Sequence, residues 1–430
     1  MILRLTFGWA IGWKVYLRGI ILSLIVAVIF FPSCKKNDVI SVQDIPVLSQ
    51  QPADVAVKWA DMTLYTIRYS AFNTPTYSSR SLGYLGLALY ESIVSGDSTH
   101  RSLSGQLNGL SLPMAETGKS YHWILSLNAA QDNLLRLLYP VPGNSHHVIH
   151  ERIDSLYQSV FKEQSKGISL ETIERSVQFG KAVAVAIYNW SSSDGGNNAF
   201  TRNFDQNYIF PSGSSYWIPP SRGQTISLFP LHPYWGNNRT FLLANSTISV
   251  PPILSFSTDP ASDYYKMYKE VYDKDRILTL EEREIAAWWG DDPIETFSPP
   301  GHSYYLATIA IKNSKSKVVK AAEAYARTGL AVADAFIYCW KAKSTYFNER
   351  PSSFVKKYID PAWIQFWPEP PFPAFPSGHA TQSAAAATVL TDLFGGSFSF
   401  TDDSHKGFRW YDDLRFLDLR YPSRSFNSFW

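Results

Sequence analysis

The stretch "PEPPFPAFPSGHATQSAAAATVL", residues 368–390, joins a proline-rich approach to a run of small residues. The prolines stiffen the chain before Ser377, because each one fixes its own φ angle and lacks an N–H donor. The residues after Ser377 are rich in alanine and include no proline, which is typical of a helix. Since serine is a common N-cap, the sequence predicts a helix that begins at Ser377.

The start of this helix has the chemistry of an anion site. Free backbone N–H groups at a helix N-terminus attract negative charge. Gly378 lets a ligand approach the backbone closely, and His379 places a titratable group beside it. The stiff approach would hold these groups in place before a ligand arrives. We therefore expect a preorganised oxyanion site here.

Two cations lie upstream, in "WKAKSTYFNERP", residues 340–351. Lys343 and Arg350 are seven residues apart, about two helical turns, so the spacing predicts that both lie on one face of a helix. Pro351 is expected to end that helix. Such a pair alone is typical of a solvated surface, but together with Ser377 and His379 it favours an anion site.

The combination K-x6-R-P followed by P-S-G-H resembles the first two signature motifs of the type 2 phosphatidic acid phosphatase and vanadium haloperoxidase superfamily. The resemblance implies that Lys343, Arg350, Ser377 and the Gly378 amide bind phosphate or vanadate oxygens. It also implies that His379 is the acid–base histidine. Three further segments resemble bacterial haloperoxidase-like lipoproteins of this group: "NTPTYSSRSLGYLGLALYESI", "PYWGNNRTFLL" and "WWGDDP…PPGH".

Two aromatic residues favour the haloperoxidase branch. Trp340 lies three residues before Lys343, and Phe372 lies five residues before Ser377; in that branch, residues at these positions line the halide pocket. Core packing is the alternative interpretation of both. The resemblance implies a vanadate cofactor with peroxide and halide as substrates, or, in the phosphatase branch, hydrolysis of a phosphate ester through phosphohistidine. No residue that coordinates a metal directly is identified.

The third motif of the superfamily, S-R-x5-H-x3-D, is not complete. Ser423 and Arg424 match its first two positions, but the histidine position falls on Trp430, and His405 lies on the other side of the pair. Either this motif has degenerated, or residues 421–430 precede a motif that has been lost. The second interpretation predicts an incomplete haloperoxidase-like chain with impaired activity, and a non-catalytic surface lipoprotein is a further alternative.

The N-terminus is expected to be a targeting segment. Lys14 and Arg18 precede the apolar run "IILSLIVAVIFF", residues 20–31, which suits a signal-peptide core. The following "PSCKK" resembles a lipoprotein signal of the Bacteroidetes type, so Cys34 is the expected lipidation site. This predicts a signal peptide at 1–33, a polar tether at 34–52 and a lipid-anchored protein of the cell envelope, at the outer membrane or its periplasmic face.

Helical patterns dominate from residue 53 onward, and the sequence predicts an all-α bundle over 53–430 with a long inserted loop at 192–260. A net charge of +2 without a basic run argues against nucleic-acid binding. Cys339 is expected to be a buried small hydrophobe. Helices are predicted at 53–70, 78–96, 121–139, 146–164, 170–191, 261–273, 280–290, 301–313, 316–346 and from 377 onward.

Overall fold

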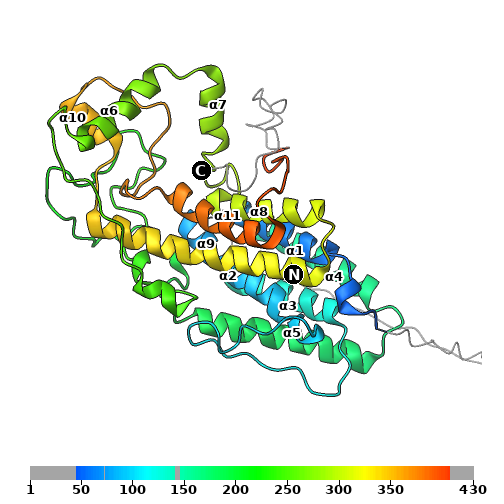
Figure 1. Ribbon diagram of the computed structural model, residues 1–430. Coiled ribbons are helices and arrows are strands. Elements are labelled where there is room, and N and C mark those ends of the chain that lie inside the picture. Colours follow the sequence, from blue (N-terminus) through cyan, green and yellow to red (C-terminus); the bar gives the residue numbers. More distant parts are fainter. Residues whose placement is uncertain (1–44, 72, 141–145, 407–430) are drawn as a thin grey trace, which may run out of the picture. The chain divides into compact units, whose positions relative to one another are not determined.

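The computed structural model describes residues 45–71, 73–140 and 146–406. These ranges contain eleven α-helices and five short 3₁₀ helices, and no strand, so the prediction of an all-α fold is confirmed (Figure 1). The α-helices are α1 (Asp54–Tyr69), α2 (Pro75–Glu91), α3 (Trp123–Leu138), α4 (His146–Gln164), α5 (Leu170–Ser191), α6 (Asp263–Arg276), α7 (Leu280–Trp288), α8 (Ser298–Asn313), α9 (Val318–Tyr346), α10 (Pro351–Tyr358) and α11 (Gly378–Phe394).

Local sequence signals place most helix ends well. Helices α4 and α5 have the predicted bounds, and Ser377 caps α11 by accepting a hydrogen bond from the Ala380 N–H at 3.2 Å. Helix α2 begins earlier than predicted, because Thr74 is its N-cap and Pro75 occupies its first turn. It also ends earlier, at Glu91. Helix α10 was not predicted.

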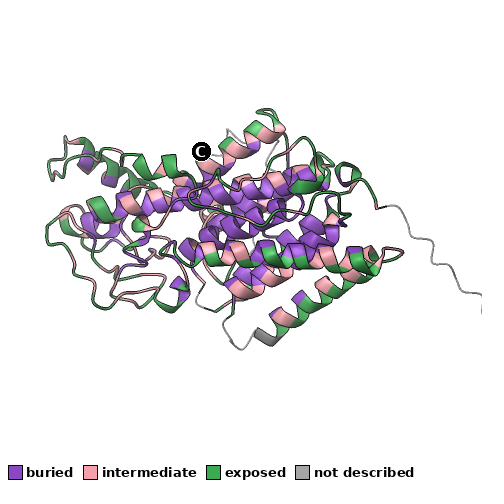
Figure 2. Cartoon of the chain, turned by 90° about the horizontal axis from the view of Figure 1, so that it is seen from below, coloured by how far each residue is buried: buried purple, intermediate pink, exposed green. Residues whose placement is uncertain are grey.

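Helix α9 lies at the centre of the bundle, with α2 on one side and α8 and α11 on another (Figure 1). Glycine allows α2 and α9 to approach closely: a Cβ atom on Gly86 would lie 2.5 Å from the Tyr325 carbonyl oxygen, and one on Gly329 would lie 2.5 Å from that of Leu82. Figure 2 shows the buried residues gathered on the facing sides of the helices. One large apolar core therefore supports α9 and α11.

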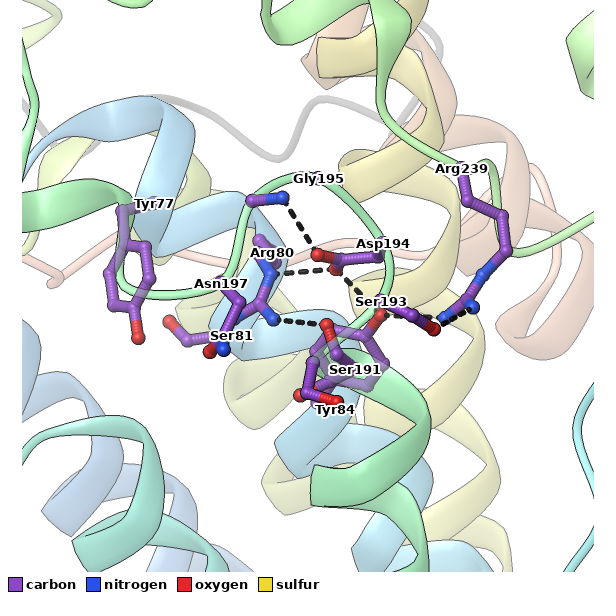
Figure 3. Close-up of polar contacts among 12 residues, drawn as sticks. Tyr77, Arg80, Ser81, Tyr84, Ser191, Ser193, Asp194, Gly195, Asn197 and Arg239 are labelled. Atoms are coloured by element: carbon purple, nitrogen blue, oxygen red, sulfur yellow. Dashed lines mark hydrogen bonds and ion pairs between the residues drawn. The ribbon is translucent and has the colours of Figure 1, made fainter.

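The predicted long insertion, 192–260, contains no α-helix, and buried polar contacts attach it to the bundle. Arg80 of α2 donates from Nε to Asp194 Oδ2 at 2.7 Å, and both side chains are almost completely buried (Figure 3). Asp194 also accepts hydrogen bonds from the Tyr84 hydroxyl and the Gly196 N–H, each at 2.7 Å. The carboxylate of Asp334 in α9 also accepts a hydrogen bond from the insertion, donated by the Phe241 N–H.

A second, smaller core joins α6 to α10. It contains Tyr264, Tyr268 and Phe354, and the rings of Tyr268 and Phe354 stack with centroids 4.4 Å apart. The Tyr268 hydroxyl donates to the carbonyl oxygen of Glu349 at 2.9 Å. This core therefore holds the residue directly before Arg350.

The predicted tether, 34–52, overlaps described residues that pack on the bundle. Leu48 is buried, and the Gln51 carbonyl accepts the N–H of Val318 at 3.0 Å. Residues 48–52 are therefore part of the folded unit rather than a linker. The signal peptide, Cys34, Ser423, Arg424 and Trp430 lie outside the described residues. Within the described ranges, no helix combines the length and apolar character needed to cross a bilayer.

Candidate oxyanion site

Lys343 and Arg350 do not share a helix, and this corrects the prediction from their spacing. Helix α9 ends at Tyr346, and Phe347 follows with a left-handed backbone (φ 46°). Arg350 is the N-cap residue of α10, and Pro351 begins that helix instead of ending the previous one. The two cations nevertheless reach the same segment, because both bind carbonyl oxygens between Phe372 and Pro376.

Lys343 is buried, with 2% of its surface exposed, and its ammonium group is fully hydrogen-bonded. Its Nζ donates to the carbonyl oxygens of Pro373, Ala374 and Pro376 at 2.7, 3.0 and 2.6 Å. Burial lowers the pKa of Lys343 to about 7, and the nearby Arg350 guanidinium adds to this effect. In this structure the three donors of the Lys343 ammonium group all bind the proline-rich segment that carries Ser377, so none is left for a ligand.

Arg350 has donors left over. Its Nε donates to the Phe372 carbonyl at 2.6 Å, and its guanidinium lies 4.9 Å from the centroid of the Phe372 ring. Burial lowers the pKa of Arg350 to about 10, which leaves it charged near neutral pH. Among the described residues, nothing accepts a hydrogen bond from its two terminal nitrogens. Those nitrogens can bind an oxyanion without breaking an existing contact.

The predicted halide-pocket residues contact each other. The rings of Trp340 and Phe372 have centroids 5.0 Å apart, and Lys343 Nζ lies 5.0 Å from the Phe372 centroid and 5.9 Å from that of Trp340. Trp340 is buried, stacks on Phe336 and donates from Nε1 to the Leu231 carbonyl at 3.1 Å. These contacts are what core packing requires, so a role in halide binding stays a prediction.

Ser377, Gly378 and His379 form the first turn of α11, as predicted. Ser377 is exposed, and a Cβ atom on Gly378 would come no closer than 4.0 Å to the Trp340 ring. The carbonyl groups of Trp289 and Gly290 act on the His379 ring and oppose the lowering of its pKa that burial causes. Its Nε2 atom is buried and has no hydrogen-bond partner among the described residues.

The surroundings of His379 favour a neutral ring. Burial is the main cause that lowers the pKa of His379, and the charge of His302 acts in the same direction. Asp291 and the two carbonyl groups oppose this shift. In the neutral tautomer with the proton on Nδ1, the lone pair lies on Nε2. That atom can accept a proton from a ligand bound at the start of α11.

A cluster of buried charged residues lies behind this turn, and the sequence analysis missed it. His302 donates from Nδ1 to Asp291 Oδ2 at 2.7 Å and from Nε2 to Asp402 Oδ2 at 2.8 Å. His405 Nε2 lies 3.1 Å from Asp291 Oδ1. Asp291, His302 and His405 have donor atoms suited to a metal ion. The segment "WWGDDP…PPGH" contains Asp291 and His302 and was the sequence signal for half of this cluster. Asp402 and His405 lie about 100 residues later, so sequence spacing did not connect them with it.

Comparison with known proteins identifies the superfamily. No protein-family model matches the chain. A solved bacterial vanadium-dependent iodoperoxidase superposes with a TM-score of 0.73 and 28% identity, over 90% of this chain and 88% of that one. The chain belongs to the vanadium haloperoxidase and type 2 phosphatidic acid phosphatase superfamily. A bacterial vanadium-dependent chloroperoxidase shares the superfamily fold at 14% identity, with a TM-score of 0.56 over 84% of each chain.

A curated relative supports the same superfamily over a shorter range. The vanadium chloroperoxidase of Curvularia inaequalis is 23% identical over 198 residues. This match covers 38% of the chain and about a third, 32%, of the length of the relative. The roles that the superfamily resemblance assigns to Lys343, Arg350, Ser377, Gly378 and His379 therefore remain predictions for this chain.

Proposed function

We propose that this protein is a haloperoxidase-like protein that binds vanadate at the start of α11. The observation that carries the proposal is the buried Nε2 of His379, which has no partner among the described residues and belongs to the first turn of the 17-residue helix α11. Arg350 reaches the segment that leads into this helix and brings two unused guanidinium nitrogens. The likeness to the bacterial iodoperoxidase supports the haloperoxidase branch.

The residues present fit a tetrahedral oxyanion. The terminal nitrogens of Arg350 supply charged donors, and the Gly378 amide and the Ser377 hydroxyl supply neutral ones. Lys343 would contribute in two ways: it holds the proline-rich segment in place, and its positive charge lies close to the bound anion. An anion beside it would stabilise the ammonium form and raise the pKa of Lys343 above the value of about 7 that burial produces.

Side chains of the protein itself would assist the haloperoxidase reaction. Bound vanadate supplies activation of peroxide toward attack by a halide. His379 would accept a proton at Nε2, because its lowered pKa keeps the ring neutral at neutral pH. Trp340 and Phe372, with Lys343 near both rings, offer an apolar surface next to a positive charge, which suits a weakly hydrated halide.

Phosphate has the same shape and donor requirements as vanadate, so phosphoric monoester hydrolysis is the second candidate activity. The reaction also needs a group that bonds to vanadium or phosphorus, which the superfamily resemblance assigns to a histidine after Arg424. Residues 406–430 include no histidine. We therefore expect a polypeptide of these 430 residues to bind oxyanion with little or no turnover of bromide or aryl phosphate.

Substituting Arg350 by alanine is expected to weaken vanadate binding by about 10-fold to 100-fold, since a charged hydrogen bond contributes about 1.5–3 kcal/mol. The measurement is titration calorimetry of the 430-residue chain with vanadate and, in a second arm, with phosphate. Arg327→Ala is the control, because Arg327 lies within α9 and pairs with Glu323 and Asp392 at the surface, away from the proline-rich segment. Equal affinities of wild type and Arg350→Ala would contradict the proposed site.

We also propose that the protein is anchored to the cell envelope through a lipid on Cys34. The support is the apolar segment 20–31 followed by "PSCKK". Cys34→Ser is expected to move the protein from the membrane fraction to the soluble fraction and to abolish labelling by a radioactive fatty acid. Cys339→Ser is the control, because Cys339 is buried in α9. Wild-type protein that is soluble and unlabelled would contradict the anchor.

A further inference from the structure

The inserted segment 192–260 contains a hollow that is separate from the oxyanion site. Its volume is about 610 Å³, and its walls come from residues 195–206 on one side and 232–238 on the other. None of the candidate oxyanion residues, Lys343, Arg350, Ser377 and His379, lines it. Binding sites for small molecules usually enclose about 300–1,000 Å³. The hollow is therefore large enough for a ligand of one or two six-membered rings.

Buried hydrogen bonds hold the two walls of the hollow in place. His232, in the second wall, is buried and has a left-handed backbone (φ 44°), which costs a residue with a side chain about 1 kcal/mol or more. Its Nε2 lies 3.1 Å from the Ala199 carbonyl oxygen, and its Nδ1 lies 2.5 Å from the Thr76 hydroxyl of α2. Its backbone N–H donates to the Asn203 carbonyl at 2.9 Å. His232 therefore joins the two walls to each other and to α2, so the hollow is formed before a ligand binds.

Three side-chain amides in the walls have unused hydrogen-bonding groups. Gln206, Asn237 and Asn238 line the hollow, and none of them has a side-chain hydrogen bond to another described residue. Asn238 faces Gly195 so closely that a Cβ atom on this glycine would lie 2.5 Å from Asn238 Oδ1. A side-chain amide offers both donors and an acceptor. The walls therefore suit a ligand whose polar groups both donate and accept, as hydroxyl groups do.

The charged side chains of the hollow disfavour an anionic ligand. Arg202 uses both terminal nitrogens on the Asn197 and Gly195 carbonyl oxygens, each at 2.8 Å. Asp205 accepts the Asn207 N–H at 2.9 Å through Oδ1, and its carboxylate stays in the wall. An anion in the hollow would meet this carboxylate, while the guanidinium that would offset it already binds carbonyl groups. The hollow therefore suits a neutral ligand.

An exposed aromatic ring gives the hollow an apolar face. Tyr234 lines it with 55% of its surface exposed, and its ring lies against the Tyr208 ring at a centroid distance of 5.7 Å. The next residue, Trp235, also lines the hollow, and its buried Nε1 has no partner among the described residues. A buried donor without an acceptor costs about 1–3 kcal/mol, which a ligand oxygen that accepts from it would offset. An aromatic face beside polar amides matches a sugar ring, which is apolar on its C–H faces and polar at its edge.

We propose that the hollow between 195–206 and 232–238 binds a neutral mono- or disaccharide. The Tyr234 ring would stack on the sugar, and the amides of Gln206, Asn237 and Asn238 would bind its hydroxyl groups. This site goes beyond the proposed vanadate function and does not depend on it, because the candidate oxyanion residues take no part in it. A sugar phosphate is the competing ligand, which the Asp205 carboxylate is expected to exclude.

The test is saturation-transfer NMR on the full 430-residue chain, with maltose, cellobiose and lactose as probes and glucose 6-phosphate as the charged comparison. We expect at least one of the three disaccharides to receive saturation at its ring C–H protons, and glucose 6-phosphate to receive none. Titration calorimetry then gives the affinity of the disaccharide that binds best. Absence of binding by all three disaccharides, or tighter binding of glucose 6-phosphate, would overturn the proposal.

Variants of the walls locate the bound disaccharide. Tyr234→Ala should weaken its binding at least about tenfold, whereas Tyr234→Phe keeps the ring and should bind it as wild type does. Asn237→Leu should weaken binding about threefold to tenfold, because it removes an amide. Tyr69→Ala is the control, because Tyr69 is an exposed tyrosine at the end of α1 that does not line the hollow. Wild-type affinity in both Tyr234→Ala and Asn237→Leu would overturn the site, whether or not the protein binds vanadate.

Discussion

Replacing Asp194 by alanine is expected to lower the free energy of unfolding by about 3–5 kcal/mol, which is the usual cost of removing one partner from a buried ion pair. Asp194 accepts hydrogen bonds from Arg80, Tyr84 and Gly196, and Arg80 has almost no access to water. Without the carboxylate, the Arg80 charge would stay buried between α2 and the start of the insertion. The Ser191 carbonyl would still accept one hydrogen bond from it, and the Tyr77 and Tyr84 rings would lie 5.7 and 4.9 Å from its guanidinium.

The measurement is chemical denaturation followed by tryptophan fluorescence and circular dichroism. Asp132→Ala is the control, because Asp132 pairs with Arg136 at the edge of the core, where both side chains keep some access to water. The substitution should cost about 1 kcal/mol or less. The double variant Arg80→Met with Asp194→Leu should be more stable than Asp194→Ala, since it leaves no charge unpaired. A double variant that is less stable than Asp194→Ala would show that the unpaired charge is not the source of the loss.

Replacing Lys343 by methionine is expected to cost about 3 kcal/mol of stability and to weaken vanadate binding at least about tenfold. Methionine fills similar space but leaves three carbonyl oxygens, of Pro373, Ala374 and Pro376, without their donor. Each lost hydrogen bond of this kind costs about 1 kcal/mol. The segment before Ser377 would loosen, and the oxyanion site would lose a nearby positive charge.

Lys341→Met separates these effects from a general effect of removing a lysine from α9. The Lys341 ammonium lies at longer distances, 3.4 and 3.3 Å, from the Ser246 and Ile248 carbonyl oxygens and is partly exposed. Its loss should change stability by less than about 1 kcal/mol and leave vanadate affinity unchanged. Equal behaviour of the two variants, in unfolding and in calorimetry, would show that the buried ammonium group has no special role.

Sequence alone determined much of the fold and part of the candidate site. The periodicity of α4 and the capping of α5 and α11 are local properties, since each depends on residues within a few positions of each other. The placement of Ser377 as N-cap of α11, with His379 in its first turn, follows from the same local rules. The K-x6-R-P and P-S-G-H motifs were sufficient to indicate the superfamily that the structural comparison supports.

Only the tertiary structure decided where Arg350 and Lys343 act. Helix α9 ends at Tyr346 and does not continue to Pro351, because the next residue, Phe347, has its ring buried against Trp217 and Tyr208. This packing stabilises a left-handed backbone at Phe347 that its local sequence disfavours. The Lys343 contacts likewise depend on the path of the proline-rich segment, 30 or more residues away.

The residues around His302 meet only because of the tertiary fold. Asp291, His302 and Asp402 come from segments that are 11 and 100 positions apart, and no periodicity or cap connects them. A histidine and two aspartates in a sequence are ordinarily surface residues, and they become a charged group behind His379 only when α8 and the segment 402–405 exclude water from them. Spacing predicts local geometry, whereas burial and long-range contacts determine which polar groups meet and what charge they carry.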